Sequence, residues 1–308
     1  MKASNIHKMA TLCSQSRLYK SFLVFLLLQI SCSFLLAQDQ QESITTDMSS
    51  PSPPLTVVVV GATGATGKHV VQQLLDHPNK PIVKVVARSS QLMLDLLSKT
   101  ASDDSYGNRL DITQASLLDL SAADLQTLTT DADAVISCLG HNMDFKGIFG
   151  QPRQLVTEAV TKLTTAMSAN GKTKTKFCLM NSDGVTSPAG TDDRRTLFER
   201  SLINVLLFLV PPHADNEAAA AYFFNVGTNS SVEWSVVRPT DLVDGEATEY
   251  TFHPKPIGSL FGSGIATRAN VAKAMVDLVT DETVWEKYKF QFPVLCDAET
   301  EKEGKGEL

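Results

Sequence analysis

Apolar and polar positions alternate in blocks along this chain from Leu55 onward. The short run Leu55–Val60 is almost wholly apolar, as strands that are buried on both faces are. Longer segments, such as Lys68–Asp76 and Leu155–Met167, carry apolar residues at helical spacing. Because strands of this kind need helices on both faces, the alternation predicts an α/β fold with a Rossmann-like, doubly wound parallel sheet.

The same pattern indicates the remaining elements. Further strands are expected at residues 83–88, 111–117, 132–138, 176–180, 235–237 and 288–295, and a late helix at 271–279. A small C-terminal substrate lobe is expected after Pro239. The segment 187–212 contains an apolar run at 202–210, which is short for a membrane span. That run is expected either to pack over the site or to touch a membrane.

The turn between the first strand and the first helix is rich in glycine. Glycine permits a tight bend and a close approach of the backbone to a pyrophosphate, and the N–H groups at the start of the next helix bind the anion. The order of strand, turn and helix therefore predicts a dinucleotide site, and the alternative is a tight turn without a ligand. The expected contacts are Gly61, Thr63, Gly64, Ala65, Thr66 and Gly67.

The second expected strand ends at Arg88, and Ser89 and Ser90 follow it. NAD-binding sites usually place an Asp or Glu here to accept a hydrogen bond from the ribose 2′-hydroxyl. A guanidinium instead suits a 2′-phosphate, which a carboxylate would repel. The sequence therefore favours NADP(H) over NAD(H), with Arg88 and Ser89 at the 2′-phosphate. The alternative for Arg88 is an ordinary surface arginine.

Composition limits the classes of function. A chain of 308 residues, 43% hydrophobic and 20% charged, can bury a sizeable core. The net charge is −7, and residues 1–37 hold four basic and no acidic side chains, so the body is more acidic still. An acidic body argues against nucleic acid as the main partner. The five cysteines are widely spaced, which argues against a disulfide framework and against metal ligation.

The N-terminal segment 1–37 has the features of a targeting signal. A basic stretch ends at Lys20, an apolar core follows, and small residues up to Ala37 suit cleavage. A signal peptide, a signal anchor and a buried helix stay open; the first two lead into the secretory route, and an anchor adds membrane association. Ser31-Cys32-Ser33-Phe34 also resembles the small-residue–Phe junction of bipartite plastid presequences in some algae, an alternative that the following acidic residues oppose.

The rest of the chain divides into three parts. Residues 38–54 are a polar linker, 55–297 are the expected NAD(P)-binding domain, and 298–308 are a charged tail. The tail ends in Lys305-Gly306-Glu307-Leu308, which resembles an ER-retention signal with glycine in place of the usual acid, so the ER is one expected location. Asn229 opens a glycosylation sequon that is usable only in that compartment.

Together these motifs resemble the atypical short-chain dehydrogenase/reductase superfamily, especially its NAD(P)H-binding group of NmrA-like and flavin-reductase-like proteins. The resemblance covers about residues 55–295 and rests on the glycine turn, Arg88, Asp133–Gly140, Met180-Asn181-Ser182, Glu233–Pro239 and Thr267–Ala272. It implies the fold and the nicotinamide cofactor, but it specifies no reaction. It also implies further residues near the cofactor: Leu139, Gly140, Asn181 and Pro239.

The chain departs from this superfamily at the catalytic pair. The standard enzymes use Tyr-x-x-x-Lys, in which the lysine lowers the pKa of the tyrosine. The nearest match is Tyr222, and Val226 occupies the lysine position. Tyr222 is either a proton donor or a helix residue that packs inward. Ser182 matches the superfamily's serine position, and it either orients a carbonyl or caps a turn beside Asp183-Gly184.

Histidines offer another source of protons at neutral pH. His141 follows the fourth strand, at the sheet edge where ligands bind in such folds, and His213 and His253 are further candidates. Each of the three is alternatively a structural histidine. A polar cluster beside His213 either joins the site or caps the helix that begins near Ala218; its members are Asp215, Asn216 and Glu217.

Two functions from different classes stay open. One is an NADPH-dependent oxidoreductase of a small carbonyl, quinone or flavin-like acceptor, because hydride transfer is the cofactor's own chemistry. The other is a catalytically silent NADP(H)-sensing regulatory or assembly protein, which the NmrA-like resemblance allows. For the first function, the catalytic candidates are Ser182, Tyr222 and His141, and no metal is expected.

Overall fold

The computed structural model describes most of the chain from Pro53 onward. It covers residues 53–98, 106–141, 150–192, 196, 198–199, 201–203, 205, 210–226, 231–258 and 264–298. The predicted leader, nearly all of the linker, Asn229, the tail beyond residue 298 and parts of the segment 187–212 lie outside the described residues. All the elements below belong to the unit Pro54–Leu308. Within the described ranges, no helix combines the length and the apolar character needed to cross a membrane.

Strands and helices alternate as the sequence predicts. The strands are β1 Thr56–Val60, β2 Ile82–Ala87, β3 Leu110–Gln114, β4 Ala134–Ser137, β5 Thr175–Met180, β6 Val232–Pro239, β7 Asp241–Val243, β8 Tyr250–His253, β9 Ile265–Thr267 and β10 Val294–Asp297. The helices are α2 Gly67–Asp76, α3 Ser90–Ser98, α4 Ala122–Thr129, α6 Leu155–Ala169, α8 Pro211–Val226, α9 Arg268–Thr280 and α10 Glu282–Tyr288.

The main sheet has eight strands in the order β3-β2-β1-β4-β5-β6-β10-β8. All neighbouring strands in it pair in parallel except β10 and β8, which are antiparallel. The strand order reverses between β1 and β4, which is the switch point of a doubly wound sheet. The predicted Rossmann-like fold is therefore confirmed.

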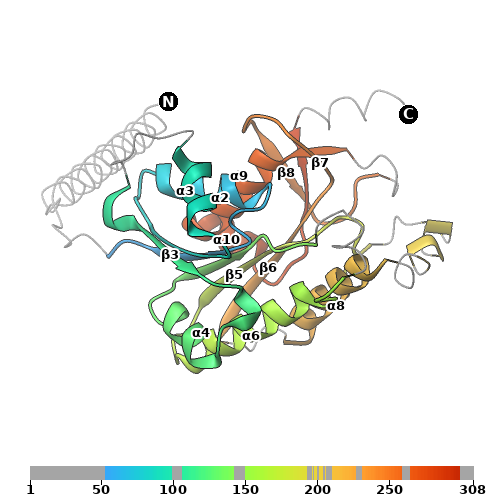
Figure 1. The fold of residues 1–308 in the computed structure, drawn as a ribbon. Helices are drawn as coiled ribbons and strands as arrows, with labels where there is room; N and C mark the ends of the chain where they lie inside the picture. The colour runs from blue at the N-terminus through green and yellow to red at the C-terminus, as the bar shows by residue number, and fades with distance from the viewer. Residues whose placement is uncertain are drawn as a thin grey trace, which may run out of the picture. The chain divides into compact units, whose positions relative to one another are not determined.

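The strand β1 shows why helices cover both faces of the sheet. Val57 and Val59 are fully buried in a core cluster shared with α2, α9 and α10, whereas Val58 and Val60 are buried in a second cluster with α4, α6 and α8. Side chains alternate between the faces of a strand, so an all-valine run needs two apolar layers. Figure 1 shows these layers, with α2, α3, α9 and α10 over one face and α4, α6 and α8 over the other.

The chain after Pro239 is divided between the main sheet and a smaller one. The strands β7 and β9 form a two-stranded parallel sheet. The strands β8 and β10 extend the main sheet, and α9 and α10 pack on it. The small C-terminal lobe thus consists of β7, β9 and their connections.

The strand expected at 288–295 is wrong in its position. The helix α10 continues to Tyr288, and β10 begins only at Val294. The segment before β10 pairs with β6 only irregularly: Gln291 forms an isolated parallel bridge with Ser235, and the Gln291 and Pro293 carbonyl oxygens accept from the N–H groups of Val236 and Arg238 at 3.0 and 2.8 Å. Phe290 has a φ of 58°, which interrupts an extended strand. The rings of Phe290 and Phe292 lie 5.7 and 5.1 Å from that of Trp234, so core packing adds to the apolar alternation.

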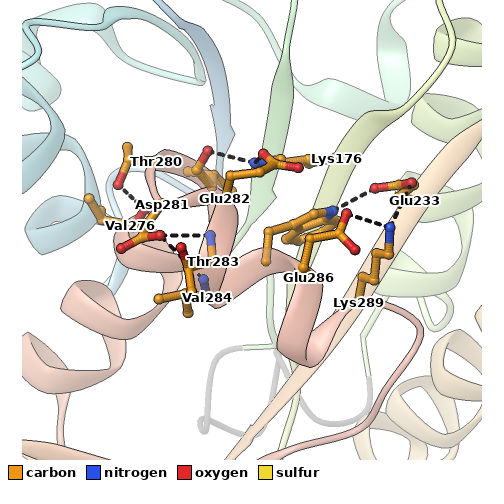
Figure 2. Close-up of polar contacts among 12 residues, drawn as sticks. Lys176, Glu233, Val276, Thr280, Asp281, Glu282, Thr283, Val284, Glu286 and Lys289 are labelled. Atoms are coloured by element: carbon orange, nitrogen blue, oxygen red, sulfur yellow. Dashed lines mark hydrogen bonds and ion pairs between the residues drawn. The ribbon is translucent and has the colours of Figure 1, made fainter. Parts of the chain in front are cut away.

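Polar contacts attach α10 to the amino ends of β5 and β6 (Figure 2). Asp281 caps the helix by accepting hydrogen bonds from the N–H groups of its first turn, at 2.8 and 3.3 Å. Lys176 of β5 forms an ion pair with Glu282 at 2.7 Å. Glu233 of β6 accepts a hydrogen bond from the Trp285 indole at 2.7 Å. The polar side chains at the amino edge therefore bind one another and attach α10 to the sheet. The opposite, carboxyl edge is the one where ligands bind in doubly wound sheets.

Candidate functional site

The carboxyl ends of β1, β4, β5 and β6 meet at one edge of the sheet. The register pairs Val60 with Ser137, Ser137 with Leu179, and Met180 with Val237. The glycine turn and the segments that begin at Cys138, Asn181 and Thr240 therefore leave the sheet at this same edge. These four segments thus open at a common edge of the sheet.

The glycine turn is shaped by close backbone contacts. Gly61 has a φ of 74°, and a Cβ placed on it would lie 2.6 Å from the carbonyl carbon and oxygen of Cys138. A Cβ on Gly67 would overlap the Gly61 carbonyl oxygen. The Gly64 N–H donates to that same oxygen at 3.0 Å. Glycine is therefore required at positions 61 and 67 for β1, β4 and α2 to approach one another.

The crest of the turn exposes backbone at the start of α2. Gly64 and Ala65 are exposed, whereas Thr66, the N-cap residue, is 4% exposed. The Thr66 side chain makes no capping hydrogen bond, and the first turn of α2 has no acidic residue. Backbone N–H groups and the positive end of the helix dipole thus face outward without a competing carboxylate. This cradle fits the pyrophosphate of a dinucleotide.

Arg88 and Ser89 follow β2, beside the cradle. The Arg88 side chain is exposed, and no hydrogen bond or ion pair joins it to another residue within the described ranges. The Ser89 hydroxyl oxygen accepts a hydrogen bond from the Leu92 N–H at 3.2 Å, at the start of α3. No carboxylate follows β2 directly. A cation next to a pyrophosphate cradle suits a further phosphate group.

His141 lies three residues beyond Cys138 and pairs with Asp215 of α8. Its Nε2 atom is 2.9 Å from Asp215 Oδ2, and the two side chains are 5% and 0% exposed. The Asp215 carboxylate also accepts hydrogen bonds from the N–H groups of Val156 and Thr157, at 2.7 and 3.0 Å, and from the Thr157 hydroxyl at 2.7 Å. Asp215 thus lies at the N-terminus of α6 as well as against the imidazole.

Asn181 and Ser182 follow β5 and are held by local hydrogen bonds. The Asn181 amide is 7% exposed and donates to the Asn216 carbonyl oxygen of α8 at 3.0 Å. The Ser182 hydroxyl oxygen accepts from the Gly184 N–H at 3.2 Å, so it caps a turn. A Cβ on Gly184 would lie 3.4 Å from Ser182 Oγ and 3.8 Å from His213 Cε1, which places His213 beside this turn.

Tyr222 and His253 have other surroundings. The Tyr222 hydroxyl is 2.6 Å from Thr164 Oγ1 of α6. The Tyr222 ring packs against the core cluster on the face of the sheet that α4, α6 and α8 cover. His253 is on β8, the last strand of the sheet, and its Nε2 lies 3.4 Å from Cys296 Sγ of β10. The structure therefore brings His141, Ser182 and His213 to the carboxyl edge near β4 and β5. The register places His253 level with Arg238 near the carboxyl end of β6, but on β8, two strands away, and Tyr222 packs within the layer of α6 and α8.

A buried ion pair, which the sequence analysis did not identify, supports the loop after β5. Arg238 of β6 is 0% exposed and binds Asp192 through two N–H···O contacts of 2.6 and 3.1 Å. The Arg238 Nε–H also donates to the Phe292 carbonyl oxygen at 2.9 Å. Asp192 accepts from the Ser187 N–H at 2.6 Å. The buried guanidinium is thus paired with a carboxylate and further hydrogen-bonded to backbone, as a buried ion pair requires.

The three described cysteines are buried and free of disulfides. Burial raises the pKa of the Cys138 thiol to about 12 and that of Cys178 well above its usual value. Such thiols remain protonated and pack as small apolar groups. The parts of the chain that the structure describes contain no cluster of metal-ligating side chains.

The fold and the cradle define a dinucleotide-binding protein of the Rossmann-like class. A family model for NAD(P)H-binding proteins matches residues 61–282, which is more than half of the chain. The chain belongs to this NAD(P)H-binding family. Its resemblance to the atypical short-chain dehydrogenase/reductase superfamily is thereby confirmed, and so is a nicotinamide cofactor.

Solved structures with the same fold include three from microbes. One is a protein from Lactobacillus casei, with a TM-score of 0.59, 20% identity, and coverage of 79% of this chain and 100% of that one. The second is a wide-type short-chain dehydrogenase/reductase from Veillonella parvula in complex with NADP. Its TM-score is 0.54 and its identity is 16%, and the match covers 80% of this chain and 96% of that one. The third is Gre2 from Candida albicans in complex with NADPH. Its TM-score is 0.51 and its identity is 17%, and the match covers 79% of this chain and 78% of that one. The curated proteins include no sequence match.

Proposed function

We propose that this protein is an NADPH-dependent reductase of a small carbonyl, quinone or flavin-like acceptor. The observation that carries the proposal is the exposed Arg88 guanidinium beside the glycine cradle, where an NAD-binding site would have a carboxylate. The Veillonella protein in complex with NADP and the Candida protein in complex with NADPH support this choice of cofactor.

The chain's own groups would hold the cofactor along the carboxyl edge. The backbone of the cradle would bind the pyrophosphate, and Arg88 with Ser89 would bind the 2′-phosphate. The nicotinamide side would lie along β4, β5 and β6, beside Leu139, Gly140, Asn181 and Pro239. Bound NADPH supplies a hydride, so the protein needs to orient the acceptor, exclude water and provide a proton.

His141 and Ser182 are the candidate proton donors at this edge. The Tyr222 hydroxyl is hydrogen-bonded to Thr164 on α6, and Val226 cannot supply the charge of the missing lysine. We therefore do not assign proton transfer to Tyr222. The same two facts favour the second candidate function, a protein that binds NADP(H) as a sensor and reduces nothing.

The cofactor assignment is tested by fluorescence titration of the protein with NADPH and NADH. A charge-assisted hydrogen bond contributes about 1.5–3 kcal/mol, so Arg88→Ala should weaken NADPH binding roughly ten- to a hundredfold and leave NADH binding nearly unchanged. Lys287→Ala is the matched control, because it removes an exposed positive charge from α10 near the opposite edge. Equal losses for both cofactors in Arg88→Ala would contradict the assignment.

The reductase assignment is tested by NADPH oxidation against a panel of quinones, flavins and aldehydes. We expect turnover with at least one acceptor class. Tight NADPH binding without turnover of any acceptor would replace the reductase with the sensor.

A further inference from the structure

His141 leaves the sheet at its switch point. This residue follows β4, which neighbours β1 at the position where the strand order reverses. Ligands of doubly wound sheets bind in the crevice outside this point. His141 therefore follows a strand that ends beside the start of the cradle, and its ring is held there against Asp215 of α8.

The Asp215 carboxylate determines how this ring is protonated. Its oxygens accept two backbone N–H groups and one hydroxyl from the first turn of α6, in addition to the contact with His141 Nε2. A carboxylate has no proton to donate, so Nε2 must carry the hydrogen of the 2.9 Å contact. The second ring nitrogen, Nδ1, makes no hydrogen bond with any residue that the structure describes. In the neutral ring, Nδ1 is then the acceptor.

We propose that His141 exchanges a proton with the acceptor through Nδ1 and that Asp215 is the positioning residue that fixes this tautomer. The proposal rests on the reductase function above. The carbonyl carbon of the acceptor takes the hydride, its oxygen gains the electron pair of the C=O bond, and that oxygen takes the Nδ1 proton of the imidazolium. NADP⁺, an alcohol and a neutral ring with its hydrogen on Nε2 remain, and a proton from solvent restores the imidazolium.

This arrangement narrows the class of acceptor. The negative charge of Asp215 balances the imidazolium before the transfer, as in other carboxylate–imidazole pairs. A proton held ready at one ring nitrogen is useful when hydride addition creates charge on an oxygen atom. The geometry therefore favours carbonyls and quinones over acceptors that leave no charge on oxygen.

The positioning role has a test that needs no turnover. In ¹⁵N spectra of histidine-labelled full-length protein, the neutral His141 ring should be protonated at Nε2 and unprotonated at Nδ1. The His141 resonance is identified by its loss in the His141→Gln variant. Asp215→Asn should abolish that preference. Thr157→Val is the matched control, since it removes a different donor to Asp215 and should leave the tautomer unchanged. A neutral ring protonated at Nδ1 in the unmodified protein would overturn the proposal.

Kinetics with the best acceptor of the panel test the proton transfer. His141→Gln should lower kcat by about 10²- to 10⁴-fold while the NADPH affinity stays within about twofold. Asp215→Asn should lower kcat by at least about tenfold with little change in KM, and Thr157→Val should change kcat by less than about threefold. If Asp215→Asn does not fold, as judged by circular dichroism, His141→Gln alone decides the kinetic test.

The outcomes separate this inference from the proposed function. Full turnover by His141→Gln would overturn the proton transfer and leave the reductase intact. NADPH binding without turnover of any acceptor would overturn both the reductase and the proton transfer, and the tautomer would still decide whether Asp215 positions the ring. Failure to bind NADPH would overturn the proposed function at its first step.

Discussion

The two edges of the main sheet differ in what their polar groups contact. At the amino edge, Lys176 pairs with Glu282, and Glu233 binds both the Trp285 indole and Lys289. At the carboxyl edge, the glycine crest and Arg88 are exposed and face solvent. Polar groups at the amino edge thus attach a helix to the sheet, whereas those at the carboxyl edge are available to a ligand. Substitutions should affect stability at one edge and binding at the other.

The largest effect on stability is expected where this division fails, at the buried Arg238–Asp192 pair. Asp192→Ala leaves a guanidinium that is 0% exposed without its carboxylate. The expected loss in the free energy of unfolding is about 3–5 kcal/mol, measured by urea denaturation. The double variant Asp192→Leu/Arg238→Met should recover part of this loss, because it removes both charges. A loss below about 1 kcal/mol in the single variant would show that the pair does not support the loop.

A smaller but still clear loss is expected at the cradle. Gly61→Ala combines a φ of 74° with a Cβ placed 2.6 Å from the Cys138 carbonyl group, so about 1–3 kcal/mol of stability should be lost together with NADPH affinity. Gly140→Ala is the matched control for stability, because a Cβ there meets nothing within 4 Å. Unfolding midpoints of the two variants test the difference, and equal midpoints would refute it.

The smallest effect is expected at the amino edge. The Glu282 side chain is 69% exposed, and its partner Lys176 is 12% exposed. Glu282→Ala should lower stability by less than about 1 kcal/mol, because exposed ion pairs contribute little. The NADPH dissociation constant should not change. A tenfold weaker NADPH affinity in this variant would mean that the two edges are coupled.

The sequence predicts the fold well because its information is local. Three features are each read within a short window: the almost wholly apolar strand β1, the helical spacing of α2 and α6, and the glycine turn between β1 and α2. The one strand placed wrongly, at 288–295, begins later than expected, because residues 290–293 pair with β6 only irregularly before β10 starts at Val294. Periodicity therefore detects the apolar segment but does not locate the start of its regular strand.

The candidate site is less predictable because its contacts are distant in the sequence. Asp215 and His141 are 74 residues apart, and Asp215 and Val156 are 59 apart. From the sequence, Asp215 was expected to cap the start of its own helix or to join the site, and the structure shows that it binds the start of α6 and His141. The Arg238–Asp192 pair spans 46 residues and has no local pattern at all. Only the folded sheet brings such residues together.

The shared duties of Asp215 have a consequence for how this chain can change over generations. One carboxylate holds the first turn of α6 and the ring of His141, so selection for a stable fold protects it even when selection for chemistry is relaxed. Among the described residues, the His141 ring is hydrogen-bonded to Asp215 and holds no helix start. Under the proposed function, a descendant that kept the cofactor but abandoned reduction should therefore lose the imidazole first, and the aspartate would persist.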